Sequence, residues 1–164
     1  MKKILCLVVL VALFIYGTPA VTLSESSAAR FLNTLETLSL TGKSAEYCAR
    51  LDDHLVVSIR DRSAPGSPRD IDGGKKEFCD YVSMAAKGMS LIGPETHFIR
   101  DNFSVQRSWL HPWTATVRYE ESRTTTLTRI GVTLETKSAD RWTLVQTFAG
   151  VKVISLQSDV QRAD

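Results

Sequence analysis

The sequence is poor in the residues that build metal and redox sites. Its 164 residues include 3 histidines and 3 cysteines. His54, His97 and His111 stand far apart, at no spacing typical of metal ligands, and there is no CxxC motif. No phosphate-binding glycine loop and no nucleophile motif occurs either. The sequence therefore predicts no metal centre and no cofactor.

The N-terminus has the pattern of an export signal. Lys2 and Lys3 precede an apolar run over residues 4–16, and small residues follow up to Ala20. We expect a signal peptide over residues 1–20, cleaved after Ala20, and a secreted or periplasmic protein. The alternative is a retained membrane anchor, for which the apolar run falls short of the roughly 20 residues of a membrane span.

An excess of positive charge is also missing once the signal is set aside. Removing Lys2 and Lys3 from the 20 basic residues leaves 18, which equals the 18 acidic residues. A nucleic-acid binder needs a basic stripe that displaces counterions from phosphates. We therefore expect no nucleic-acid partner, and one domain over residues 21–164.

Cys48 and Cys79 are the cysteines that remain after the signal. An even pair in an oxidising compartment favours one disulfide, and the rival interpretation is two buried free thiols. No spacing indicates a catalytic or metal-binding role for them.

Helical periodicity dominates the first part of the mature chain. Apolar residues from Ala28 to Leu38 recur at helical spacing, Thr22 and Glu25 resemble a capping box, and Gly42 can end the helix. Ser44 is expected to cap a short second helix through Leu51. Residues 55–59 predict a strand, and residues 62–74 predict a loop. Asp72 is expected to cap a third helix that carries Phe78, Tyr81 and Val82 on one face and ends at Gly88.

After Pro94 the chain becomes rich in β-forming residues. Segments 96–108, 114–126, 126–136 and 141–154 predict four strands. Alternation predicts which side chains face the helices: Ala115, Val117 and Tyr119; Ile130, Val132 and Leu134; Trp142, Leu144, Gln146 and Phe148. Helices followed by an antiparallel meander predict an α+β fold.

Four short stretches resemble the NTF2-like superfamily, which includes nuclear transport factor 2, ketosteroid isomerase and SnoaL-like proteins. These stretches are Gly42-Lys43, "LDDHLVV" (51–57), "GGKKEFCDYV" (73–82) and "ADRWTLVQTF" (139–148), the last interpreted as a turn into the final strand. The resemblance covers a core of about residues 26–154. It implies a cone of three N-terminal helices packed on a strongly curved, mostly antiparallel sheet, with a cavity between them and often a homodimer through the sheet.

The stretch "ARLDDHLVVSIRD" (49–61) gathers acidic and basic residues and invites a catalytic interpretation. The resemblance places Asp52 and Asp53 where a helix ends, and Asp favours turns and local backbone hydrogen bonds. It also puts Ser58 near the position of the isomerase base, and the first helix offers no tyrosine. The isomerase residues do not carry over, and no Asp-Arg-Asp array of the epoxide-hydrolase type is visible.

Four residues are candidates for lining the cavity: Tyr81, His97, Gln146 and Asp61. His97 shares parity with Ile99 and is expected to point inward. Buried polar groups need partners, so Tyr81, His97 and Gln146 can each serve either internal hydrogen bonding or ligand contact.

Trp109, His111 and Trp113 surround Pro112 in a turn between strands. This cluster can form an exposed partner surface, or it can pack over the open end of the cone.

The incomplete catalytic set favours an exported, non-catalytic module that binds a small apolar ligand in its cavity or a protein through its sheet. The alternative is a cavity enzyme of isomerase or hydrolase type that uses Asp61, His97 and Tyr81. A further alternative retains the N-terminus as a membrane anchor and makes the chain a periplasmic scaffold component of a secretion system.

Overall fold

The computed structural model describes residues 23–64, 69–127 and 131–163. The expected signal peptide over residues 1–20, its cleavage after Ala20 and the predicted orientation of Ile130 lie outside the described residues.

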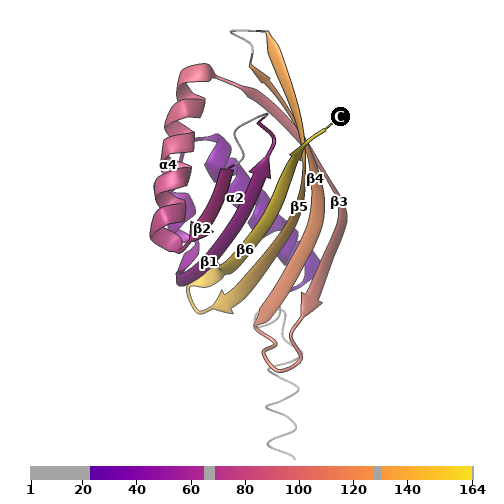
Figure 1. Ribbon diagram of the computed structural model, residues 1–164. Coiled ribbons are helices and arrows are strands. Elements are labelled where there is room, and N and C mark those ends of the chain that lie inside the picture. The colour runs from indigo at the N-terminus through magenta and orange to yellow at the C-terminus, as the bar shows by residue number, and fades with distance from the viewer. Residues whose placement is uncertain (1–22, 65–68, 128–130, 164) are drawn as a thin grey trace, which may run out of the picture.

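Helices come first in the chain and long strands follow (Figure 1). In chain order the elements are α2 Glu25–Leu40, α3 Ser44–Ala49, β1 Leu51–Arg62, β2 Arg69–Gly73, α4 Lys75–Ile92, β3 Glu95–Arg107, β4 Thr114–Leu127, β5 Val132–Thr147 and β6 Gly150–Arg162. The predicted α+β fold is confirmed.

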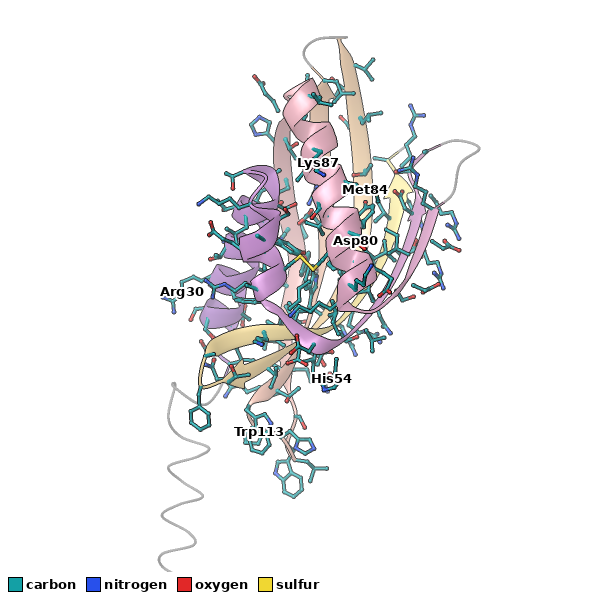
Figure 2. The ribbon with its side chains drawn as sticks, turned by 90° about the vertical axis from the view of Figure 1, so that its left-hand side faces the viewer. Arg30, His54, Asp80, Met84, Lys87 and Trp113 are labelled. Carbon is teal, nitrogen blue, oxygen red and sulfur yellow. A yellow bond between two sulfur atoms is a disulfide. The ribbon has the colours of Figure 1, made fainter. Side chains whose placement is uncertain are left out.

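The described strands form one sheet in the order β2-β1-β6-β5-β4-β3. The β1–β6 pair is parallel, and every other neighbouring pair is antiparallel. The sheet curves strongly, and α2 and α4 lie against the same side of it (Figures 1 and 2). We call the side under the helices the inner face and the opposite side the outer face.

The first helix begins two residues later than a Thr22 cap would place it. Ser24 is the N-cap, and its Oγ accepts a hydrogen bond of 3.2 Å from the backbone N–H of Ser27. Gly42, with φ of 71°, ends the helix as predicted, because it lets the Lys43 N–H donate back to the Leu38 carbonyl.

Two other predicted caps are wrong. Lys43, not Ser44, precedes α3 and gives no side-chain cap, and the helix ends before Leu51, which opens β1. Asp72 lies in β2, a strand inside the segment predicted as a loop, where it accepts hydrogen bonds from Ser58 and Arg60. Cross-strand pairing therefore outcompetes helix capping at Asp72.

The last two predicted strands are divided at a different place in the structure. β5 runs without a break through Trp142, and the turn comes at Phe148, so the final strand is β6. Phe148 is fully exposed, contrary to its predicted inward orientation. Val132 and Leu134 are also exposed, because this end of β5 pairs with β4 but not with β6.

The core lies between the helices and the inner face. Ala115, Val117 and Tyr119 are buried there as predicted, together with Trp142 and Leu144. On the helix side the buried residues are Leu23, Ala28, Phe31, Leu32, Leu35, Leu38, Tyr47, Phe78 and Val82.

Cys48 in α3 and Cys79 in α4 lie at disulfide distance, with their Cα atoms 5.8 Å apart. The predicted pairing is therefore supported by the geometry, and it links the two helices at one edge of the core.

Asp52 and Asp53 begin β1 directly after α3, so they are strand residues and not turn residues. The expected local hydrogen bond is present, because Asp52 Oδ1 accepts the His54 N–H at 3.0 Å. His54 is exposed, and Asp53 pairs with Lys75 at 2.7 Å. The stretch that invited a catalytic interpretation is thus built from local structural contacts.

Candidate functional site

Asp61 and Tyr81 are the two predicted site residues that the fold brings near each other. Asp61 lies near the end of β1, and Tyr81 lies on α4 above the inner face, stacked on Phe78. Burial raises the pKa of Tyr81, and the Asp61 carboxylate raises it further. Asp61 Oδ1 accepts hydrogen bonds from the backbone and side chain of Ser63. The Asp61 carboxylate is therefore held by Ser63, two residues further along the chain.

His97 and Gln146 lie elsewhere. His97 is exposed on the outer face together with Ile99, so its predicted inward orientation is wrong. Gln146 is half-buried near the opposite end of the sheet, and its amide donates to the Thr147 carbonyl at 3.2 Å. The four predicted residues do not form one site.

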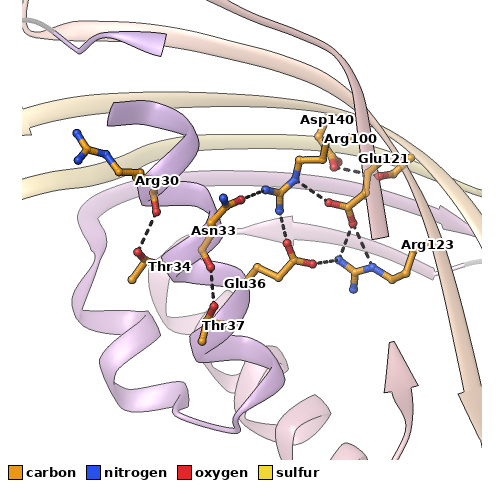
Figure 3. A network of polar contacts seen from close by, with 10 residues as sticks. Arg30, Asn33, Thr34, Glu36, Thr37, Arg100, Glu121, Arg123 and Asp140 are labelled. Carbon is orange, nitrogen blue, oxygen red and sulfur yellow. Dashed lines mark hydrogen bonds and ion pairs between the residues drawn. The ribbon is translucent and has the colours of Figure 1, made fainter. Parts of the chain in front are cut away.

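The inner face instead carries a network of buried charges between α2 and the sheet (Figure 3). Glu36 comes from α2, Arg100 from β3, and Glu121 and Arg123 from β4. Arg100 forms an ion pair with Glu36 and another, at 3.0 Å, with Glu121. Arg123 contacts Glu121 at 2.6 Å and Glu36 at 3.3 Å.

Every carboxylate oxygen of this network has a guanidinium partner. Arg100 holds Oε2 of both glutamates, and Arg123 holds Oε1 of both. Glu36 and Glu121 are 8% and 5% exposed, so these arginines replace most of the solvation that the two carboxylates lose on burial. We call Glu36, Arg100, Glu121 and Arg123 the charge network.

Arg100 is the most enclosed cation of the network. Its guanidinium carbon lies 4.9 Å from the Phe98 ring centre and 5.1 Å from that of Tyr119. Its remaining terminal nitrogen donates to the Asn33 side-chain oxygen. Two aromatic rings and three hydrogen-bond acceptor side chains therefore surround the Arg100 guanidinium.

Two acids at this site are harder to ionise than usual. Burial raises the pKa of Glu36, and the nearby Glu121 carboxylate raises it further, against the pull of Arg100 and Arg123. Burial likewise raises the pKa of Asp140 in β5, although it accepts hydrogen bonds from Ser138 and Ser158. The charge network itself contains two glutamates and two arginines, so its formal charges balance.

Asp140 predicts a specific pH dependence of stability. Its pKa is raised in the folded state, so the folded chain binds this proton more tightly than the unfolded chain, and the free energy of unfolding falls as pH rises through the raised value. In Asp140→Asn, the decrease in the free energy of unfolding that comes from this carboxyl group should be absent. Urea midpoints from about pH 4 to about pH 8 measure it. Asp159→Asn, on the outer face, is the control for losing one carboxylate, and a wild-type slope in Asp140→Asn would contradict the assignment.

The outer face holds a groove of about 550 Å³ that crosses the sheet from β1 to β3. Both charged and uncharged residues line it: Ser58, Arg60, Asn102, Ser104, Arg118, Tyr119, Glu120, Ala139, Asp140, Arg141, Gln157, Ser158 and Asp159. The strand register explains the hollow, because the small Ala139 lies between Glu120 and Asp159 in neighbouring strands.

Sequence reasoning missed the charge network, although a signal for it was present. Glu121 and Arg123 continue the alternation of Val117 and Tyr119 along the inner face, and Glu36 lies on the stripe of Leu32 on α2. Charged residues at positions where the hydrophobic periodicity predicts buried residues indicate a buried ion pair.

Among the described residues, no group of three or more histidines, cysteines or carboxylates could hold a metal ion. No helix in the same part of the chain is long and apolar enough to span a membrane.

No protein-family model and no curated protein matches the sequence. Solved structures do match. The β subunit of benzoate 1,2-dioxygenase from Burkholderia mallei aligns with a TM-score of 0.67 and 12% identity, over 85% of this chain and 91% of the other. Aln2 from a Streptomyces species aligns with a TM-score of 0.59 and 17% identity, over 82% and 87% of the two chains.

An NTF2-like protein with a cystatin-like fold from Novosphingobium aromaticivorans aligns with a TM-score of 0.53 and 15% identity, over 82% of this chain and 88% of the other. Similarity at these identities defines architecture and not activity. The helix order, the mixed curved sheet and these alignments together establish that the chain has the NTF2-like fold.

Proposed function

We propose that the chain is an exported, non-catalytic module that binds proteins through the outer face of its sheet. The partner that this surface fits best is a second copy of the same chain. The observation that carries this proposal is the complete internal pairing of the charge network. Both oxygens of Glu36 and both oxygens of Glu121 are bound by arginines, so neither glutamate is free to accept a proton from a substrate.

The outer face offers what the inner face lacks, an open surface. The described helices lie on the opposite side of the sheet, and the groove presents both charge signs. Arg118 and Arg141 are directly paired across β4 and β5, and Glu120 and Asp159 flank Ala139 beside them. A surface with adjacent positive and negative rows is complementary to itself under a two-fold rotation.

This chemistry favours a protein partner over a small apolar ligand. Several arginines and carboxylates line the groove, and such groups pair with the charges of a protein surface, which an apolar ligand does not supply. The disulfide geometry of Cys48 and Cys79 supports the exported location, because disulfides persist in oxidising compartments.

Sedimentation equilibrium of the exported protein tests the proposal. Arg118→Glu places a second acid beside Glu120 on the same face, and we expect the dimer dissociation constant to rise about tenfold or more from like-charge contact. Arg30→Glu makes the same charge change on the exposed side of α2 and should leave association unchanged. A protein that stays monomeric at all concentrations, or associates equally in both variants, would rule out the outer face as a self-binding surface.

A cavity enzyme of isomerase or hydrolase type is the second candidate, and Asp140 is the observation that favours it. A carboxyl group whose pKa is raised by burial is a candidate general acid. Turnover that disappears in Asp140→Asn while self-association persists would favour the enzyme. Self-association without turnover in the wild type favours the binding module.

A further inference from the structure

Four large apolar side chains project from one end of the fold. Trp109, Leu110 and Trp113 lie on the β3–β4 loop and are 82%, 70% and 41% exposed, and Phe148 on the β5–β6 turn is fully exposed. We call these four residues the aromatic tip. Figure 2 shows Trp113 at this end, directed away from the helices and the sheet. Of the two sequence interpretations of this loop, packing over the cone is therefore wrong and exposure is confirmed.

The tip is held in place by hydrogen bonds at its base. The Ser108 N–H donates to the Thr114 carbonyl, and the His111 N–H donates to the Ser108 hydroxyl. The Trp113 carbonyl accepts the Gln146 N–H at 2.8 Å, which joins the β3–β4 loop to β5 just before Phe148. Pro112 is buried beneath them. The two loops thus form one fixed platform that presents its apolar side chains to solvent.

The two chain segments that carry the tip contain basic but no acidic residues. From Phe103 to Tyr119 and from Arg141 to Ser158 the sequence contains no Asp or Glu, while Arg107 and Lys152 lie within these ranges. The acids at this end come from other elements, Glu25 in α2 and Asp52 and Asp53 in β1. Asp53 pairs with Lys75 and also interacts with Lys152, so Arg107 is the cation of the tip that these acids engage least. The tip therefore combines exposed aromatic residues with cations on its own strands.

The chain also enters the fold at this end. Leu23 is buried directly before α2, and the start of α2 lies at the same end as the β3–β4 loop in both views (Figures 1 and 2). Six residues, 17–22, separate the apolar run over residues 4–16 from Leu23.

We infer that the aromatic tip is a membrane-docking site that inserts into the headgroup region of an anionic phospholipid bilayer. Tryptophan concentrates at membrane interfaces, where its ring is buried and its N–H stays near water, and cations beside it attract anionic headgroups. A protruding set of side chains suits a fluid surface that closes around each of them, whereas a protein partner would have to supply matching hollows.

Vesicle binding of the exported protein, in whichever N-terminal form the cell releases it, tests this inference. Vesicles of phosphatidylcholine and phosphatidylglycerol are mixed with the protein, and brominated chains report contact by quenching tryptophan emission. Trp109→Ser combined with Phe148→Ser should lower the vesicle partition coefficient at least tenfold. Ile99→Ser removes an exposed apolar side chain on the outer face and should leave the partition coefficient unchanged.

Because Trp109 and Phe148 are exposed, the double variant should keep the thermal midpoint of the wild type, and Trp109→Ser alone serves if it does not. Absence of vesicle binding would overturn the inference. Binding that survives the double variant, or binding without bromolipid quenching, would also overturn it, because the N-terminal segment alone would then hold the protein. Loss of self-association instead of vesicle binding would reassign the tip to a protein contact.

Discussion

Replacing Arg100 with methionine is expected to destabilise the protein by about 3–5 kcal/mol, the largest effect of any single substitution considered for this fold. Methionine keeps the apolar contacts with Phe98 and Tyr119 but removes the charge. Glu36 and Glu121 would then remain buried with one cation between them. An uncompensated buried charge is what makes the loss so large, and urea unfolding at neutral pH measures it.

Two further variants separate this mechanism from a general loss of packing. Arg118→Met removes an exposed arginine from the outer face and should change the free energy of unfolding by no more than about 0.5 kcal/mol. Adding Glu36→Gln to Arg100→Met removes the stranded negative charge and should restore part of the lost stability. An Arg100→Met variant as stable as Arg118→Met would show that the charge network does not hold the inner face together.

The second large effect is expected from removing the link between α3 and α4. Cys48 and Cys79 are separated by 31 residues, and a cross-link of that span stabilises by roughly 3–4 kcal/mol in the chain-entropy description. The Cys48→Ala and Cys79→Ala double variant should lose that amount in urea unfolding. The measurement requires non-reducing conditions for the wild type.

Reduction of the wild type provides the matched control for the double variant. A reductant should shift the wild-type midpoint to that of the double variant and leave the double variant unchanged. Peptide mapping that finds both cysteines as free thiols in the exported protein, with a midpoint indifferent to reductant, would contradict the pairing.

The order of the elements could be predicted because periodicity changes clearly along the chain. The stripe from Ala28 to Leu38 has helical spacing, and the alternation of Ala115, Val117 and Tyr119 has the period of a strand. The division between β5 and β6 could not be predicted in the same way, since Asp140 and Arg141 resemble turn residues in the sequence. In the structure both are paired on each side, and Gly150, with φ of 108°, takes part in the turn instead.

The site was harder to predict, for two physical reasons. On β3, Asn102 has φ of 55° at a register shift between Asp101 and Ser104, so the inward parity changes from Phe98 to Phe103 along one strand. A simple alternation could not place His97 correctly without that bulge. The charge network depends on Glu36, whose partners lie on strands far along the chain, and charged residues are seldom fully buried unless paired.

For the aromatic tip, the sequence indicated an aromatic turn but not whether its side chains are exposed. Trp109 and Trp113 next to Pro112 are equally compatible with a packed turn and a projecting one. Only the fold shows that Trp113 projects from this end (Figure 2) and that its carbonyl is bound by the Gln146 N–H, two residues before Phe148. Sequence patterns therefore located the feature, and the strand register determined its environment.

Carboxyl footprinting with a carbodiimide and an amine, read residue by residue in mass spectra, tests the central claim most directly. That claim is that the inner-face acids are sealed structural groups and that binding takes place on the outer face. We expect Glu120 and Asp159 to be labelled in dilute protein and protected at concentrations where the protein self-associates. Glu36 and Glu121 should stay unlabelled throughout, because both are buried and paired. Labelling of Glu36 or Glu121 in the folded protein, with Glu120 and Asp159 equally reactive at every concentration, would contradict the account.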